Sequence, residues 1–282
     1  MTSLIARARS LLFVPALRPE RFAKALNSGA GCVILDLEDA VAPEQKGLAR
    51  DHLADSLPEL GRTQLARTLV RINAAGTPWY EEDLKLLAEW SAQGLAGVVV
   101  PKSEEIATLQ EVGAALGAAA QLVPLVESLA GLDAVHLLAR TPQVARLAFG
   151  HLDFQLDLGM RCGTEETELT SARFALVAAS RRGQLPAPVD GVTVDTANVQ
   201  RLLDDSHRAR AFGFGGKLCI HPAQVRPVEE SFAPSPSEVE WAQRVVNEAR
   251  SRKGEAFSLD GRMVDLPVVR LAEKTLLLAG RP

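Results

Sequence analysis

The sequence predicts an α/β fold of the (β/α)8 (TIM) barrel class, followed by a C-terminal helical lid or arm. Short apolar runs typical of buried parallel strands alternate with amphipathic helical runs about eight times. Acidic residues stand at or just after the ends of several of these strand-like runs. No Gly-x-Gly-x-x-Gly motif follows the first run, which disfavours an open dinucleotide-binding sheet.

The expected strands are apolar runs that end at Gly, Pro or polar residues. They cover Ser10–Leu17, Cys32–Leu37, Leu69–Asn73, Gly97–Lys102, Leu122–Val126, Arg146–Gly150, Ala187–Val194 and Gly216–Ile220. The helices between them are expected at Pro19–Ser28, Pro43–Leu57, Tyr80–Ser91, Ser103–Leu116, Leu129–Ala139, Glu165–Arg182 and Asn198–Ala211. Ser103 is the expected N-cap of its helix.

The composition changes after the last strand, at the sequence FAPSPS. We therefore expect a catalytic barrel over residues 1–230 and a C-terminal extension over residues 231–282. Helices are expected at Glu238–Arg252, capped by Ser235 or Ser237, and at Leu266–Leu278. Because the extension is too short to bury its own core, it is expected to pack on the barrel or on a neighbouring subunit.

Bulk properties exclude several classes of protein. A formal net charge of -4 over 282 residues does not favour binding to nucleic acid. The apolar run near the N-terminus is broken by Pro15 and followed by charges, so we do not read it as a signal peptide. No run approaches the roughly 20 apolar residues that span a bilayer. Three widely spaced cysteines fit a reducing compartment, and we expect a cytoplasmic protein.

Glu127 and Asp153 form the strongest candidate pair. Each follows one of two consecutive strands, at the barrel end where active sites form. Two carboxylates with few other ligands nearby suit Mg²⁺ better than zinc. The alternative is that each acid caps the helix that follows it.

A second acidic group, Asp36, Glu38 and Asp39, follows the second strand. These acids would either hold metal-bound waters as an outer shell or form an acidic turn before a helix. Arg71 lies within an apolar strand and needs an oxyanion partner. That partner would be a substrate oxygen or a carboxylate of Asp36 or Glu38, and the two roles are compatible.

Other candidates are weaker. Lys102 ends a strand and would suit a metal-free, Schiff-base aldolase, although the acid pair argues against that chemistry. Arg18, Arg21 and Lys24 follow the first strand and would receive phosphates or form a solvated helix face. His221 is expected in a turn, and His151 is expected to point to solvent.

Several stretches resemble the citrate lyase β-subunit-like branch of the HpcH/HpaI aldolase superfamily, which includes malyl-CoA and citramalyl-CoA lyases. They are RSLLFVPALRPERFAKAL, ILDLEDAVAP, LVRIN, VVVPK, PLVES, LAFGHLDFQLDLG, GKLCIHPAQV and DGRMVDLPVV. The resemblance covers nearly the whole chain in order. It implies a homotrimeric (β/α)8 barrel with Mg²⁺ held by Glu127 and Asp153.

The resemblance also assigns roles to residues. It implies that Arg71 binds the substrate's acyl or carboxylate oxygens, and that Asp265 reaches into a neighbouring subunit as an acid/base. Contacts to CoA are implied for Phe13, Arg18, Lys24, Ile220 and His221. The chain departs from the family pattern at Ser128 and at His151-Leu152.

The implied activity is magnesium-dependent carbon–carbon cleavage, or condensation, of a 3-hydroxyacyl-CoA thioester such as malyl-, citramalyl- or citryl-CoA. The products of cleavage would be acetyl-CoA and a 2-oxo acid. One alternative is a citrate lyase β subunit that acts on a citryl group carried by an acyl-carrier protein within a complex. Another is a CoA-independent, metal-dependent 2-oxo acid aldolase.

Overall fold

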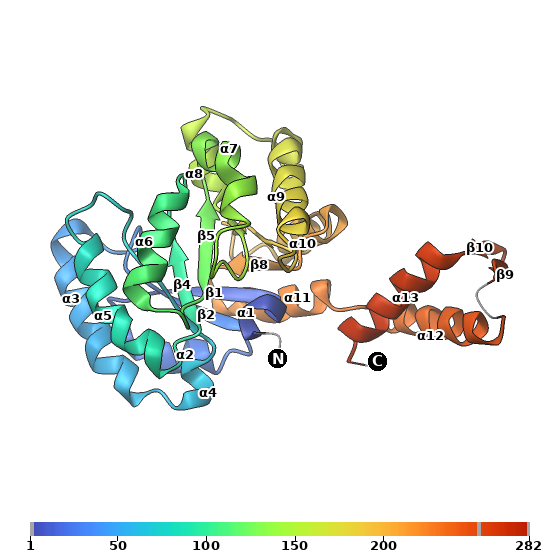
Figure 1. Ribbon diagram of the computed structural model, residues 1–282, viewed down its shortest axis with the longest axis horizontal. Coiled ribbons are helices and arrows are strands. Elements are labelled where there is room, and N and C mark those ends of the chain that lie inside the picture. Colours follow the sequence, from blue (N-terminus) through green and yellow to red (C-terminus); the bar gives the residue numbers. More distant parts are fainter. Residues whose placement is uncertain (1–2, 253–254, 281–282) are drawn as a thin grey trace. The chain divides into compact units, whose positions relative to one another are not determined.

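A closed parallel barrel forms the larger part of the computed structural model, which describes residues 3–252 and 255–280. Its strands pair in chain order and the last pairs with the first, while helices surround them (Figure 1). The predicted (β/α)8 barrel is confirmed. The strands are β1 (Ser10–Pro15), β2 (Cys32–Asp36), β3 (Thr68–Arg71), β4 (Gly97–Val100), β5 (Leu122–Val126), β6 (Ala148–Phe149), β7 (Val189–Asp190) and β8 (Gly216–Cys219).

The helices that alternate with these strands occupy most of the predicted ranges. They are α1 (Leu4–Arg7), α2 (Phe22–Leu26), α3 (Lys46–Ser56), α4 (Arg62–Leu65), α5 (Tyr80–Gln93), α6 (Ile106–Leu116), α7 (Leu129–Leu138), α8 (His151–Asp157), α9 (Thr170–Arg182), α10 (Val199–Phe212) and α11 (Pro222–Phe232). Short 3-10 turns lie at Pro19–Arg21, Pro43–Gln45, Leu57–Glu59 and Thr167–Leu169.

The structure corrects some of the expected boundaries. Helix α6 begins at Ile106 with Glu105 as N-cap, because the hydroxyl of Ser103 donates to the carbonyl of Val100 and caps nothing. Strand β7 is shorter than predicted, since Pro186 and Pro188 have no N–H to donate to a neighbouring strand. Helices α8 and α11 were not expected. The first starts at once after Gly150, and Pro227 inside the second obscures its helical pattern.

Alternate strand residues fill the barrel interior. Ile34, Leu69, Leu125 and Leu218 belong to one buried apolar cluster. Side chains alternate along a strand, so residues two positions apart point to the same side. Asp36 and Arg71 therefore point inward, as Ile34 and Leu69 do, but lie nearer the carboxyl ends of β2 and β3. Asp36 and Arg71 are also register partners.

A buried arginine lies at the amino-terminal end of the barrel strands, opposite the carboxyl ends near Asp36 and Arg71. Arg146 donates hydrogen bonds to the carbonyls of Ile5 (2.9 Å), Ala8 (2.5 Å) and Ala187 (2.7 Å). The side chain is 1% exposed, and burial lowers its pKa to about 10. Arg146 thus ties the N-terminal segment to the barrel at this end, away from the inward-facing acids.

The chain divides into two compact units, Met1–Glu229 and Glu230–Pro282. In the second, α12 (Pro236–Ser251) begins with a capping box formed by Ser235 and Glu238, so Ser235 is the cap of the two serines that the sequence offered. A hairpin of β9 (Phe257–Leu259) and β10 (Arg262–Val264) leads into α13 (Leu266–Leu278), which lies along α12 (Figure 1).

The expectation that this segment cannot bury a core is wrong. The two helices and the hairpin enclose an apolar cluster that includes Ala242, Val246, Phe257, Val264 and Leu276. The cluster is small, and exposed leucines remain on α13, namely Leu266, Leu271, Leu277 and Leu278. Packing of this unit on a barrel or on a neighbouring subunit stays a prediction.

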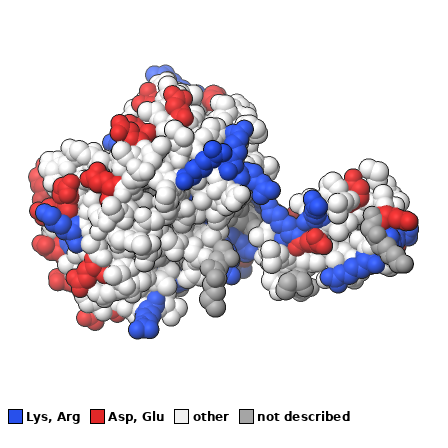
Figure 2. Space-filling view, in the orientation of Figure 1, with Lys and Arg blue, Asp and Glu red and all other residues white. Residues whose placement is uncertain are grey.

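The barrel surface carries charges of both signs. On the face shown in Figure 2, acidic side chains gather over α3 and α5, and basic side chains gather over α9 and α10. Helix α5 has three acids in its first turn, and α9 ends in Arg181 and Arg182. Each helix within the described ranges is too short or too polar to cross a bilayer.

Candidate active site

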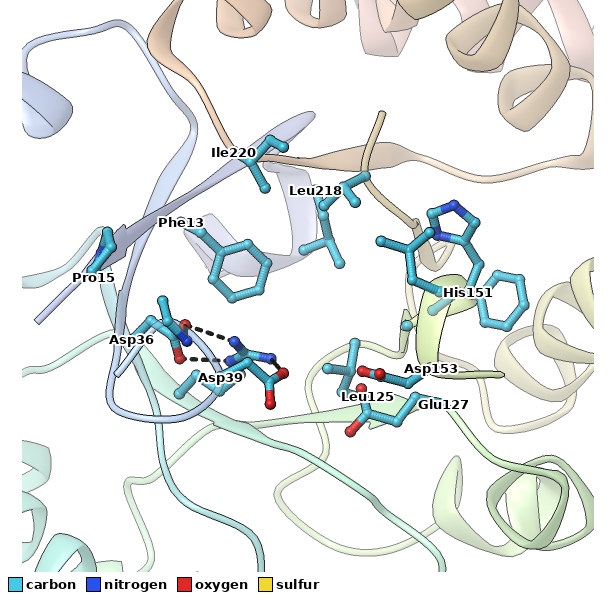
Figure 3. Close-up of a pocket in the computed structure, with 16 residues that line it drawn as sticks. Phe13, Pro15, Asp36, Asp39, Leu125, Glu127, His151, Asp153, Leu218 and Ile220 are labelled. Atoms are coloured by element: carbon cyan, nitrogen blue, oxygen red, sulfur yellow. Dashed lines mark hydrogen bonds and ion pairs between the residues drawn. The ribbon is translucent and has the colours of Figure 1, made fainter. Parts of the chain in front are cut away.

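A cavity of about 400 Å³ opens at the carboxyl ends of the barrel strands. Figure 3 shows its acidic and apolar side chains converging from several strands and the loops after them. Among its lining residues are eight candidates from the sequence: Phe13, Asp36, Asp39, Arg71, Glu127, His151, Asp153 and Ile220. These residues are far apart in the chain, and closure of the barrel brings them together.

Glu127 directly follows β5 and is only 3% exposed. Its Oε1 accepts the backbone N–H of Lys102 at 2.7 Å. Lys102 has φ of 44°, a left-handed conformation that is costly for a residue with a side chain and typical of functional sites. Oε2 is buried and finds no hydrogen-bond partner among the described residues.

The position of Glu127 also depends on a glycine. Gly150 lies between β6 and α8, and a Cβ at this position would lie 2.6 Å from both Cβ and Oε2 of Glu127. Such a contact is far inside van der Waals distance. The carboxylate therefore occupies space that any larger residue at position 150 would fill.

Asp153 lies in the first turn of α8, half-buried, and lines the same cavity. Figure 3 shows its carboxylate next to that of Glu127. The pKa of Glu127 is raised to about 7, chiefly by burial and also by the Asp153 charge, while the Lys102 N–H opposes the rise. Among the described residues no third Asp, Glu, His or Cys joins the pair to form a larger ligand group.

This donor set fits a hard divalent cation. Two adjacent carboxylates, one with a buried and unpaired oxygen, would be relieved of mutual repulsion by a cation between them. Mg²⁺ is commonly held by one or two carboxylates and keeps several waters. That Glu127 and Asp153 are its ligands stays a prediction.

Arg71, at the end of β3, is 8% exposed and surrounded by acids. Asp36 accepts two hydrogen bonds, from Nε at 2.7 Å and from Nη2 at 2.6 Å (Figure 3). Nη1 donates to Asp39 at 3.0 Å and pairs with Glu38 at 2.8 Å. The centre of the Phe13 ring lies 4.9 Å from Cζ of Arg71. These carboxylates leave one N–H of Nη2 available for a substrate oxygen.

The acidic group Asp36, Glu38 and Asp39 thus binds Arg71 directly, which was one of the two alternatives for that arginine. Burial raises the pKa of Glu38 to about 8, although the Arg71 charge opposes the shift. A role of these acids in holding metal-bound water stays a prediction.

Lys46 is a supporting residue that sequence reasoning missed. It lies in the first turn of α3, is 5% exposed, and donates from Nζ to the carbonyls of Leu37 (2.7 Å) and Glu38 (2.8 Å). It therefore holds the backbone of the acidic loop that in turn orients Arg71. A lysine seven residues after an acidic turn was the available signal, but its burial was not apparent from the sequence.

The remaining predicted residues lie outside the lining of this cavity. Arg18 pairs with Glu20 at 2.6 Å, Lys24 is exposed on α2, and His221 is exposed just before α11. Asp265 belongs to the second unit, where it caps α13 by accepting the N–H of Val268. The side chain of Lys102 is exposed and does not line the cavity, so the structure does not support the Schiff-base alternative.

His151 corrects another expectation. It was expected to point to solvent, yet it is 4% exposed and lines the cavity. Burial lowers its pKa to about 4, so the imidazole is neutral at physiological pH. The reason is that α8 turns inward immediately after β6 and places the first residue of the helix against the loop that follows β7.

Comparison with known proteins agrees with this architecture. The model of the HpcH/HpaI aldolase/citrate lyase family matches residues 9–222. A citrate lyase subunit beta-like protein of Mycobacterium tuberculosis is 37% identical, over 99% of this chain and 98% of its own. The human mitochondrial citramalyl-CoA lyase is 31% identical, and the match covers 96% of this chain and 85% of that protein.

The solved structures include protein CitE of M. tuberculosis in complex with magnesium, acetoacetate and coenzyme A. It superposes with a TM-score of 0.83 at 35% identity, covering 98% of this chain and 99% of that one. The motifs that suggested the resemblance therefore lie in a matching fold. The chain belongs to the HpcH/HpaI aldolase/citrate lyase family.

Proposed function

We propose that this protein is a magnesium-dependent carbon–carbon lyase that cleaves a 3-hydroxyacyl-CoA thioester to acetyl-CoA and a 2-oxo acid, or runs the reverse condensation. The observation that carries the proposal is the pair Glu127 and Asp153, which line one cavity with Arg71. The relatives add support, because one is named citramalyl-CoA lyase and a similar structure holds magnesium and coenzyme A.

In this proposal Glu127 and Asp153 hold the cation. When bound, Mg²⁺ acts as a Lewis acid and template for the oxygens of the 2-oxo acid half. The Lys102 N–H keeps one oxygen of Glu127 in place, and the other is left to the cation. Burial and this hydrogen bond hold the Glu127 carboxylate in place before substrate arrives.

Arg71 provides the positive charge for the thioester half. Cleavage moves the electron pair of the breaking carbon–carbon bond onto the acetyl carbon, and the substrate hydroxyl becomes the keto group. The enolate so formed carries its charge on the thioester oxygen, where the N–H of Nη2 that does not bond Asp36 would donate. Its acid partners and the Phe13 ring hold the guanidinium in one orientation.

Asp265 of a neighbouring subunit, as acid/base, would accept the proton that the substrate hydroxyl releases and return it to the acetyl carbon. The half-buried carboxylate caps α13, and the exposed leucines of that helix suit a contact between subunits of a trimer. The CoA moiety would contact Phe13 and Ile220, which line the cavity. It would also contact Arg18, Lys24 and His221, which lie on the surface in the segments that follow β1 and β8.

The test uses the purified chain with malyl-, citramalyl- and citryl-CoA, with and without Mg²⁺, and detects acetyl-CoA and the 2-oxo acid. Cleavage that stops with EDTA, and in Asp153→Ala protein with an unchanged circular dichroism spectrum, is the expected result. Cleavage that continues in EDTA would refute the mechanism.

The name of the 37%-identical relative favours one second candidate, a subunit that acts on a citryl group borne by an acyl-carrier protein. It predicts that all three CoA thioesters stay intact while citryl-acyl-carrier protein is cleaved. A CoA-independent aldolase would instead cleave 4-hydroxy-2-oxo acids and would tolerate loss of Arg18 and Lys24.

A further inference from the structure

Helix α8 carries Asp153, so the placement of this helix decides how that carboxylate faces Glu127. The helix has only seven residues. Its first turn is fixed to the barrel, because His151 and Phe154 are buried and the Phe154 ring meets that of Phe149 edge-on, with centroids 5.5 Å apart. Its last turn is more exposed, so these contacts leave the tilt of the helix open. A contact at the far end is needed to fix the direction of Asp153.

The last turn of α8 is tied to the start of α7 by Asp157. This acid follows Asp153 by about one helical turn, so the two lie on the same face of α8. Its Oδ2 accepts the backbone N–H of Leu129 at 2.8 Å. Leu129 is the first residue of α7 and stands two positions after Glu127. One hydrogen bond therefore joins the segment that carries Asp153 to the segment that carries Glu127.

This bond is additional to the ordinary cap of α7. The first N–H groups of a helix have no partner within it, and the residue just before the helix usually accepts one of them. Ser128 fills that role, since its Oγ accepts the N–H of Gly131 at 3.1 Å. The N–H of Leu129 is bound by an acid 28 positions away, from a different helix. A carboxylate at a helix N-terminus makes a charge-assisted hydrogen bond and is favoured by the helix dipole.

The start of α7 is itself held against the loop that follows β4. The hydroxyl of Ser128 donates to Oε1 of Glu104 at 2.7 Å. A Cβ on Gly131 would lie 2.8 Å from the carbonyl oxygen of Ser103, so the two backbones approach closely here. Asp157 therefore anchors α8 to a part of the barrel mouth that other contacts already fix.

Resting on the metal site of the proposed function, we propose that Asp157 is a positioning residue whose bond to Leu129 sets the separation of the Glu127 and Asp153 carboxylates. These carboxylates lie next to each other (Figure 3), and like charges repel until a cation binds. The bond keeps α8 from tilting away. Mg²⁺ demands nearly ideal octahedral geometry with oxygens at about 2.0–2.1 Å, whereas Ca²⁺ accepts about 2.3–2.6 Å and variable geometry. Loss of the bond should therefore weaken binding of Mg²⁺ more than binding of Ca²⁺.

Two substitutions remove the bond from opposite sides. Asp157→Ala removes the acceptor, and Leu129→Pro removes the donor while keeping the charge of Asp157. Proline is favoured at the first position of a helix, and Ser128 before it has the extended backbone (φ -144°, ψ 165°) that a following proline favours. Asp157→Asn loses the charge but keeps an oxygen that can accept the N–H. Leu156→Ala is the matched control on α8, because Leu156 is 80% exposed and does not line the cavity.

Calorimetry on the purified chain, without substrate, measures the dissociation constants of Mg²⁺ and Ca²⁺. We expect Asp157→Ala and Leu129→Pro each to weaken Mg²⁺ binding about 10-fold, the lower end of what loss of a supporting contact costs at a metal site. The double variant should be at most about 2-fold worse than either single variant, since both remove the same bond. Asp157→Asn should stay within about 3-fold of the native protein, because a neutral acceptor keeps part of the bond strength. Leu156→Ala should match the native protein for both ions.

A helix cap without a positioning role predicts a different result. Asp157→Ala would then lower Tm, while the Mg²⁺ and Ca²⁺ constants and their ratio stayed native, and this outcome would overturn the inference. An equal loss in Asp157→Asn would mean that charge alone matters, and an equal loss in Leu156→Ala would mean that the effect is unspecific; either result also rejects it. Two variants break the bond so that misfolding of one, seen by circular dichroism, does not decide the matter.

The same data separate this inference from the proposed function. Native Mg²⁺ binding in both variants, together with thioester cleavage that stops with EDTA, would reject the inference and leave the lyase standing. If the chain bound Mg²⁺ but cleaved no thioester, the lyase would fail, and the binding constants would still decide the role of Asp157. If the native chain bound no Mg²⁺, or Asp153→Ala bound it equally well, the metal site and this inference would both be refuted.

Discussion

Replacing Gly150 with alanine tests whether the position of Glu127 matters for function. The added methyl group would lie 2.6 Å from Cβ and Oε2 of Glu127 and 3.3 Å from Cγ of Leu125. Carbon atoms in contact prefer about 3.5–4.0 Å, so Glu127 or the backbone must move by about 1 Å. Glu127 is buried and tied to the Lys102 N–H, and it has little room to do so.

The expected cost follows from that displacement. Overpacking of this kind destabilises proteins by about 1–3 kcal/mol. For a chain of this size, that lowers Tm by about 2–10 °C. A displacement of about 1 Å in a catalytic group can reduce turnover about 100-fold. The Mg²⁺ concentration for half-maximal activity should rise, because the carboxylate that would bind the ion is the group displaced.

The assays are thermal unfolding with and without Mg²⁺ and a Mg²⁺ titration of thioester cleavage. The control is Gly47→Ala, since a Cβ at that exposed position in α3 has nothing within 4 Å, and alanine should slightly stabilise the helix. If Gly150→Ala matched the native protein in Tm, Mg²⁺ dependence and kcat, the role given to Glu127 would be wrong.

Three further predictions concern the same site. The pKa of Glu127 is raised from its usual value of 4.5 to about 7, so its protonated form favours the fold at low pH and this contribution is lost as the pH rises through 7. Mg²⁺ needs the ionised form, and the Tm increase it produces should therefore grow between pH 6 and 8 and vanish in Glu127→Gln; a flat profile would contradict this. Arg71→Lys keeps the charge but loses the two-point contact with Asp36, and kcat/KM should fall about 100- to 1000-fold in steady-state assays; near-native kinetics would exclude the role of Arg71. Asp265→Asn and Glu127→Gln should each be inactive, and co-expression should restore about a quarter of native activity if each site uses Asp265 of a neighbouring subunit. Activity that stays at the level of the single variants would refute that arrangement.

Local pattern determined most of the fold. Each strand from β1 to β8 lies within or next to a predicted run, because buried strands need apolar residues whatever their partners are. The same reasoning placed Glu127 and Asp153 after neighbouring strands, and they line one cavity. Alternation along β2 and β3 placed Asp36 and Arg71 on one side of the sheet, where they pair.

Tertiary structure decided what depends on residues far apart in sequence. The room for the Glu127 carboxylate comes from Gly150, and its hydrogen bond comes from a left-handed residue, Lys102, after another strand. The burial of His151 depends on Gly191, 40 positions along the chain. Burial and close contact are set by how distant segments pack, and short-range periodicity carries no record of that packing. Sequence pattern thus predicted that Glu127, Asp153, Asp36 and Arg71 meet at the barrel mouth. Folding placed His151 there as well, left Arg18, Lys24 and His221 outside the cavity lining, and set how each lining residue is held.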